Sequence, residues 1–175
     1  MARFSILPAL TLRGREFRGL RGFAGKPSHP PLTDVPVAAY LLAAVFDVVS
    51  AAAGDDSSIG RDFFVSATHV IVAGAVVSLA TAATGFWDWW RATTPGTEVR
   101  RTANWHMAVM LTVTALVVAD IVVRLAAWDD GATGPAVLIL SLLAGALVGF
   151  GAVYGGALVY DHGFNVEAPA SAADD

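Results

Sequence analysis

Hydrophobic residues run along this chain in four long stretches that are separated by shorter polar segments. The stretches cover roughly residues 35–53, 62–84, 103–127 and 135–160, and each is close to the ~20 residues that a helix needs to cross a hydrocarbon core. The loops expected at 54–61 and 128–134 are short, so consecutive helices should pack side by side in opposite directions. The pattern therefore predicts an all-α fold, an integral membrane antiparallel four-helix bundle.

Residues at the ends of the stretches agree with these limits. Asp34 can cap the first helix with Pro36 in its opening turn, and Pro135 can open the fourth. Gly163 suits the position just past the end of the fourth helix. We predict three parts: a basic cytoplasmic arm over 1–33, a four-helix transmembrane domain over 34–163, and a disordered acidic tail over 164–175.

The distribution of basic residues predicts an orientation. Six of the eleven Lys and Arg residues precede the first stretch and three lie between the second and third: Arg3, Arg13, Arg15, Arg18, Arg21, Lys26, Arg91, Arg100 and Arg101. By the positive-inside rule both termini should face the cytoplasm. We expect the arm to lie on the anionic inner leaflet, and docking of the arm to a partner protein is the alternative.

The amino-acid composition limits the class of protein and the kinds of binding site that the chain can form. Of the 175 residues, 55% are hydrophobic and 15% charged, whereas soluble domains average about a quarter charged residues. The net charge of -4 gives no indication of nucleic-acid binding. The chain has no cysteine, which excludes disulfides, thiolate-bound iron–sulfur clusters and covalent c-type haem, so His, Asp and Glu are the plausible metal ligands. We predict no catalytic residue, because there is no G-x-S-x-G nucleophile elbow, and we do not expect the chain to be an enzyme on its own.

Ionisable residues interrupt three of the hydrophobic stretches at a similar depth. Asp47, His69 and Asp120 should each lie about 10–12 Å below the outer face, given the helical rise per residue. Arg124 comes one turn after Asp120 and could pair with it. Intramembrane charges are costly and mark candidate sites. The buried polar layer of Asp47, His69, Asp120 and Arg124 is either a pairing network that fixes helix register, or a proton relay, a cation site or an anchor for a cofactor.

A second polar layer is expected at the cytoplasmic end. His29 precedes the first stretch, His106 opens the third and His162 closes the fourth. Imidazole is the commonest protein metal ligand, and Asp88 could hold the second nitrogen of such a ligand. Three histidines suffice for a metal ion with an open position, and two from facing helices suffice for a b-type haem. We therefore predict His29, His106 and His162 as candidate ligands of a haem or a divalent metal.

Two structural features are also predicted. Five tryptophans fall near the ends of the stretches, where the membrane interface favours them. Small residues form a ridge on the fourth helix: Ser141, Gly145, Gly149, Ala152 and Gly156. Such a ridge allows close helix approach, either inside the bundle, which we favour, or at an oligomer interface.

Four motifs carry a family resemblance. They are H-P-x5-P at His29, Pro30 and Pro36; G-x-x-D-W at Gly85, Asp88 and Trp89; R-x-A-x-x-H at Arg101, Ala103 and His106; and G-G-A-L-V-Y-D-H-G over 155–163. With these motifs in this order, the chain resembles, over about residues 26–166, a bacterial family of predicted four-helix membrane proteins known only as domain of unknown function number twenty-two thirty-one.

The resemblance implies a multi-pass protein of the bacterial inner membrane. It also implies an association with redox proteins, since some members of that family are joined to Rieske iron–sulfur domains or found beside cytochromes. A Rieske-type partner of this chain would be a separate polypeptide. We therefore predict a protein that supports respiratory or other electron transfer. The alternatives are a cofactor-free accessory or assembly subunit of a membrane complex, and a small proton or cation conductor that uses Asp47, His69 and Asp120.

Overall fold

Four helices form an up-and-down bundle in the computed structural model, which describes residue 20 and residues 27–166. The helices are α1 (His29–Ala53), α2 (Ser58–Ala92), α3 (Glu98–Ala126) and α4 (Pro135–Tyr160). Each is long and apolar enough to cross a membrane, and the described residues contain no strand, so the predicted all-α bundle is confirmed. Residues 1–19, 21–26 and 167–175, which hold most of the predicted basic arm and acidic tail, lie outside the described part.

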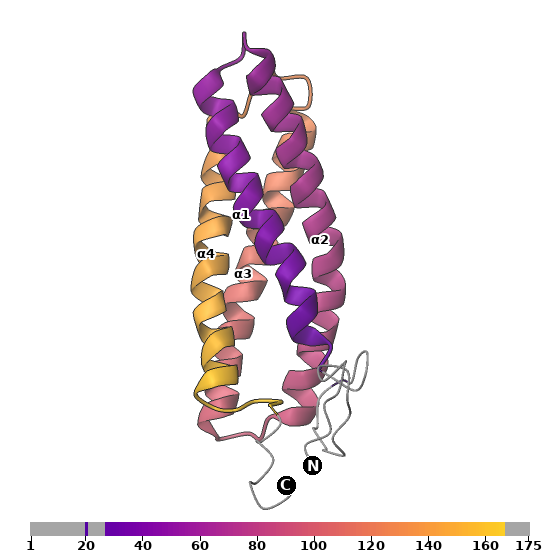
Figure 1. Ribbon diagram of the computed structural model, residues 1–175, viewed down its shortest axis with the longest axis vertical. Coiled ribbons are helices and arrows are strands. Elements are labelled where there is room, and N and C mark those ends of the chain that lie inside the picture. Colours follow the sequence, from indigo (N-terminus) through magenta and orange to yellow (C-terminus); the bar gives the residue numbers. More distant parts are fainter. Residues whose placement is uncertain (1–19, 21–26, 167–175) are drawn as a thin grey trace, which may run out of the picture.

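The bundle consists of two helical hairpins. α1 packs most extensively against α2, and α3 against α4. The hairpins meet along a seam at which α1 contacts α4 and α2 contacts α3, and the α2–α3 contact is the smallest of these. α1 begins and α4 ends at the same end of the bundle (Figure 1), which we call the His29 end.

The first helix begins earlier than the sequence predicted. It starts at His29, so residues 29–33 belong to the helix and not to the arm, and Asp34 lies inside it and does not cap it. The interior Pro36 has no N–H to give to the carbonyl of Leu32 one turn before it. The hydroxyl of Thr81 on α2 donates to that carbonyl at 3.1 Å. A side chain from the neighbouring helix thus replaces the missing hydrogen bond, and α1 continues through its proline.

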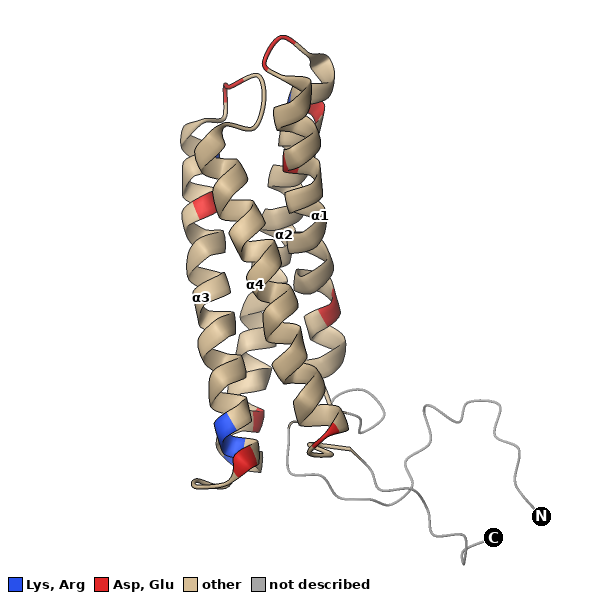
Figure 2. Cartoon of the chain, turned by 90° about the vertical axis from the view of Figure 1, so that its left-hand side faces the viewer, with Lys and Arg blue, Asp and Glu red and all other residues tan. Residues whose placement is uncertain are grey.

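The second helix is also longer than predicted and continues through the tryptophan-rich segment to Ala92. Trp87 and Trp90 are exposed, as expected for rings at a membrane interface. The guanidinium of Arg100 lies 3.6 Å from the centre of the Trp89 ring and donates to the Trp89 carbonyl. Charged residues gather toward the two ends of the bundle and are sparse along its middle (Figure 2). The predicted orientation in the membrane stays a prediction.

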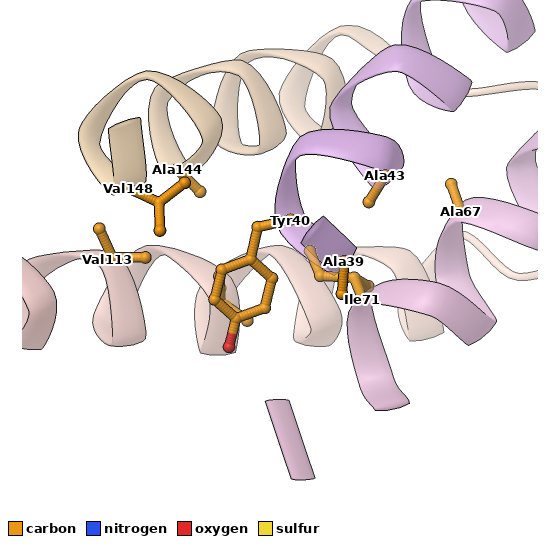
Figure 3. Close-up of a cluster of buried hydrophobic side chains, with 9 residues drawn as sticks. Ala39, Tyr40, Ala43, Ala67, Ile71, Val113, Ala144 and Val148 are labelled. Carbon is orange, nitrogen blue, oxygen red and sulfur yellow. The ribbon is translucent and has the colours of Figure 1, made fainter. Parts of the chain in front are cut away.

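The core is built from small and β-branched side chains of all four helices. Tyr40 reaches from α1 into the middle of the bundle and is the one large side chain in the group (Figure 3). The other buried members are Ala39, Ala43, Ala67, Ile71, Val113, Val117, Ala144 and Val148. Small side chains let the helix backbones approach closely, which holds the polar side chains at both ends in fixed positions.

The small-residue ridge of α4 is only partly buried. Ser141 and Gly145 are buried, with Gly145 against Ala44 of α1, whereas Gly149 and Ala152 are exposed. The buried face continues instead through Val148 and Gly151. α4 packs on two neighbours at once, α1 and α3, so its buried face does not follow a single ridge. The exposed part of the ridge has no partner within the described chain.

Candidate functional site

Two histidines from different hairpins face each other near the His29 end. The ring centres of His29 on α1 and His106 on α3 lie 6.4 Å apart, with the ring planes at 82°. Nδ1 of His29 is 3.0 Å from the Thr81 carbonyl oxygen, and Nδ1 of His106 is 2.9 Å from the Gly151 carbonyl oxygen. A carbonyl only accepts, so both Nδ1 atoms carry the hydrogen and donate. In the neutral form of each ring, Nε2 is therefore the nitrogen whose lone pair can bind a ligand.

Each ring of this histidine pair packs on a glycine of the other helix in its own hairpin. A Cβ on Gly85 would lie 2.6 Å from Cε1 of His29, and one on Gly155 would lie 3.3 Å from Cε1 of His106. In both hairpins the glycine stands four residues after the accepting carbonyl, on Thr81 or Gly151. Glycine and carbonyl together fix the position and the tautomer of each imidazole, as is typical of metal-ligating histidines.

The third predicted ligand lies apart from the pair. Nε2 of His162 is 3.2 Å from the hydroxyl oxygen of Thr102, one turn before His106 on α3. Within residues 27–166, no three His, Asp or Glu side chains gather where a metal ion could be held. Of the three predicted histidines, the structure brings His29 and His106 together and leaves His162 aside.

Asp88, the predicted partner of a ligating histidine, holds chain segments instead. One carboxylate oxygen accepts the backbone N–H of Leu20 at 2.7 Å, and the other accepts the side-chain amide of Asn165 at 3.2 Å. Asp88 thus ties the segments before α1 and after α4 to the end of α2. It does not hydrogen-bond to either histidine of the pair within the described chain.

A fully buried charge cluster lies toward the opposite end of the bundle. Asp47 on α1, together with Asp120 and Arg124 on α3, has no exposed surface. The Arg124 guanidinium donates to both carboxylate oxygens of Asp47, at 2.9 Å for Nη1, and from Nε to Asp120 at 2.9 Å. The Thr133 hydroxyl adds a further donor to Asp47 at 3.0 Å. One guanidinium therefore bridges two carboxylates and joins the hairpins.

Every buried polar side-chain atom in the described residues has a hydrogen-bond partner. Ser50 extends the cluster, because its hydroxyl donates to the Gly60 carbonyl at 2.6 Å and accepts the Thr133 N–H at 2.9 Å. His69, which we expected in this layer, is exposed, and its ring packs edge-on against Trp128 at 6.2 Å. The structure thus brings Asp47, Asp120 and Arg124 together and leaves His69 out of the group.

Several of these contributors were not among the predicted site residues. Ser50 and Thr133 complete the charge cluster, and the carbonyls of Thr81 and Gly151 orient the histidines. Backbone carbonyls carry no residue-specific signal, so only the structure shows them. Gly85 and Gly155 stand within the family-like motifs, and that position was the available signal for their packing role.

One comparison with known proteins gives a match. A family model described as predicted membrane protein, DUF2231, matches residues 25–168, which is most of the chain. The chain belongs to the DUF2231 family. No curated protein and no solved structure matches it.

The DUF2231 match covers all four helices together with the histidine pair and the charge cluster. Membership in this family confirms the resemblance that the four sequence motifs indicated. Together with the four apolar helices, it identifies a multi-pass membrane protein. The description of the family names no ligand, so the role of both sites rests on their geometry.

Proposed function

We propose that this DUF2231 protein is a membrane electron carrier whose redox group, a b-type haem or a metal ion, is bound by the Nε2 atoms of His29 and His106. The observation that carries the proposal is the pair itself. Two imidazoles from opposite hairpins lie at 6.4 Å, and each has its Nδ1–H fixed on a backbone carbonyl. Such bonding fixes the tautomer and makes Nε2 a better ligand.

The spacing of the rings supports a shared ligand. A metal–imidazole bond is about 2.0 Å long, so two imidazoles on opposite sides of one metal have ring centres roughly 6 Å apart. The observed separation is 6.4 Å. When bound, a haem or metal would supply one-electron redox chemistry. His29 and His106 would hold this group and fix its orientation between the two hairpins.

The position of the pair indicates where electrons would enter and leave. The pair lies near the His29 end, where Arg91, Arg100 and Arg101 also stand, and by the positive-inside rule this is the cytoplasmic face of a bacterial inner membrane. The proposed partner is a separate redox protein of that membrane, such as a Rieske-type iron–sulfur protein. It would exchange one electron at a time with the bound group.

The test is an absorption spectrum, before and after dithionite, and a metal analysis of protein extracted from its own membranes in mild detergent. We expect a redox-active absorption band or a stoichiometric metal, and its loss in His29→Ala and in His106→Ala. His69→Ala is the matched control, because that exposed imidazole should leave the signal unchanged. If the native protein has no absorption band and no bound metal, the proposal is overturned and a cofactor-free accessory subunit is favoured.

A further inference from the structure

The buried positions of the first hairpin recur in the second. Asp47 and Arg124 are separated by 77 positions, and His29 and His106 have the same separation. That separation also relates three further pairs of buried residues on α1 and α3: Pro36 and Val113, Tyr40 and Val117, Ala43 and Asp120. The inward-facing residues of α1 and α3 therefore follow one pattern.

The buried positions of α2, the second helix of the first hairpin, recur in the same way on α4, the second helix of the other hairpin. A single constant offset relates four pairs of buried residues on α2 and α4: Ala67 and Val137, Ile71 and Ser141, Gly74 and Ala144, Asp88 and Leu158. The same offset relates Thr81 to Gly151 and Gly85 to Gly155, the carbonyls and glycines that hold the two histidines. The hairpins are thus two copies of one packing unit, arranged as parallel repeats about an axis along the bundle.

Two contacts locate this axis. When equivalent residues of two repeats touch each other, they lie on either side of the symmetry axis. His29 faces His106, and Asp47 pairs with Arg124, so the axis passes between the members of both pairs. The equivalents of His69 and His162 are Ile139 and Ala92, which cannot ligate a metal. Within the repeat, His29 and His106 are therefore the matched histidines.

We infer that the redox group is a six-coordinate haem whose iron lies on this pseudo-two-fold axis, with one histidine from each hairpin as axial ligand. The inference rests on the proposed function and specifies the group and its coordination. A structural or catalytic zinc ion takes three or four protein ligands, whereas His29 and His106 have no third His, Asp or Glu side chain beside them in the described part of the chain. A porphyrin supplies four nitrogens of its own, so two axial imidazoles complete the coordination.

The seam between the hairpins is where the porphyrin plane would lie. His29 packs on α2 and His106 packs on α4, so the space between the two rings lies at the seam between the hairpins. The α2–α3 side of this seam is the least packed, and it contains an apolar groove of about 260 Å³ that is lined by Ser78 of α2 and Thr114 of α3, among others. Ser78 comes one turn before Thr81, whose carbonyl accepts from His29, and Thr114 comes two turns after His106, so the groove lies farther along the bundle than the histidine pair.

The test combines electron paramagnetic resonance with absorption spectroscopy on native protein in the ferric state. We expect a low-spin signal, and strong anisotropy of that signal because the imidazole planes stand at 82°. His29→Gly and His106→Gly should each convert the haem to high spin or lose it, and added imidazole should restore low spin. His162→Gly is the matched control and should keep the native signal.

Four results would overturn the inference. A native high-spin haem, or a low-spin signal that survives the loss of either histidine of the pair, would reject the axial ligands but leave a haem-based carrier. A redox metal without haem would reject the porphyrin and leave the proposed function standing. Absence of both haem and metal would overturn the proposed function together with this inference.

Discussion

Asp47 of α1 and Arg124 of α3 occupy equivalent positions in the two hairpins and form a bidentate ion pair with no exposed surface. Arg124 also binds Asp120 one turn before it, so a single cation serves two buried carboxylates. In an apolar interior, removal of one partner leaves a charge without compensation, which costs far more than the pair gains. The pair therefore links the two hairpins by an interaction that is costly to break.

Arg124→Met should be strongly destabilising, because it leaves Asp47 and Asp120 without their shared donor. We expect a loss of about 3–5 kcal/mol in the free energy of unfolding, measured by denaturation in mixed detergent micelles. Arg101→Met is the control, since Arg101 pairs with Glu98 on an exposed surface and such pairs contribute about 1 kcal/mol or less. Equal stability of the two variants would contradict the role given to the buried pair.

Ser50→Ala should destabilise the end of the bundle opposite His29. The change removes an acceptor for the Thr133 N–H and a donor for the Gly60 carbonyl, and each unsatisfied buried group costs about 1–3 kcal/mol. Hydrogen exchange of the Thr133 amide should accelerate as well. Ser66→Ala, at an exposed position of α2, should change neither quantity. An unchanged Thr133 amide in Ser50→Ala would argue against this connection.

Gly85→Ala should displace the ring of His29, because the new Cβ would lie 2.6 Å from Cε1 of that ring. We expect a loss of about 1–3 kcal/mol in stability from overpacking and a shift of the His29 imidazole resonances. Gly155→Ala, at 3.3 Å from His106, should have a smaller effect of the same kind.

The control for these glycine variants is Gly149→Ala. A Cβ at position 149 meets nothing within 4 Å, and alanine favours a helix over glycine by about 1 kcal/mol. Gly149→Ala should therefore be neutral or stabilising and leave both histidine resonances in place. If Gly85→Ala behaves like Gly149→Ala, the packing of His29 on α2 is not as described.

Asp88→Ala should release the segments that flank the bundle at the His29 end. Its carboxylate accepts the Leu20 N–H and the Asn165 amide, and neither donor has another protein acceptor among the described contacts. We expect faster hydrogen exchange at Leu20 and a stability loss of about 1–3 kcal/mol. Asp161→Ala removes an exposed carboxylate from the same end and serves as the control. Protection of the Leu20 amide that persists in Asp88→Ala would contradict the prediction.

Some features of the helices were predictable and others were not. Hydrophobic length identified all four helices, because crossing a hydrocarbon core imposes a minimum run of apolar residues. The start of α1 was placed too late, since Asp34 was interpreted as its N-cap and Pro36 as part of its opening turn. Thr81 on the neighbouring helix satisfies the carbonyl that Pro36 leaves free, and a local pattern contains no information about such a contact.

The level of a residue along the bundle was predictable from the sequence, but the direction in which its side chain points was not. Counting residues along the helices placed Asp47 and Asp120 at one level, and the structure brings them together on Arg124. The same counting placed His69 beside them, but that side chain points outward against Trp128. Depth follows from the fixed rise of a helix, whereas facing depends on how each helix is rotated against its neighbours.

The sequence by itself determined the class of the protein, a four-helix membrane bundle, because the bilayer requires long apolar helices whose backbone groups bond internally. It also supplied the ionisable residues that such a bundle can bury only in pairs. Tertiary structure alone decided which of them meet: His29 with His106, and Asp47 with Arg124. Those partners lie on different hairpins, and close packing along the seam, which no local pattern encodes, sets their registration.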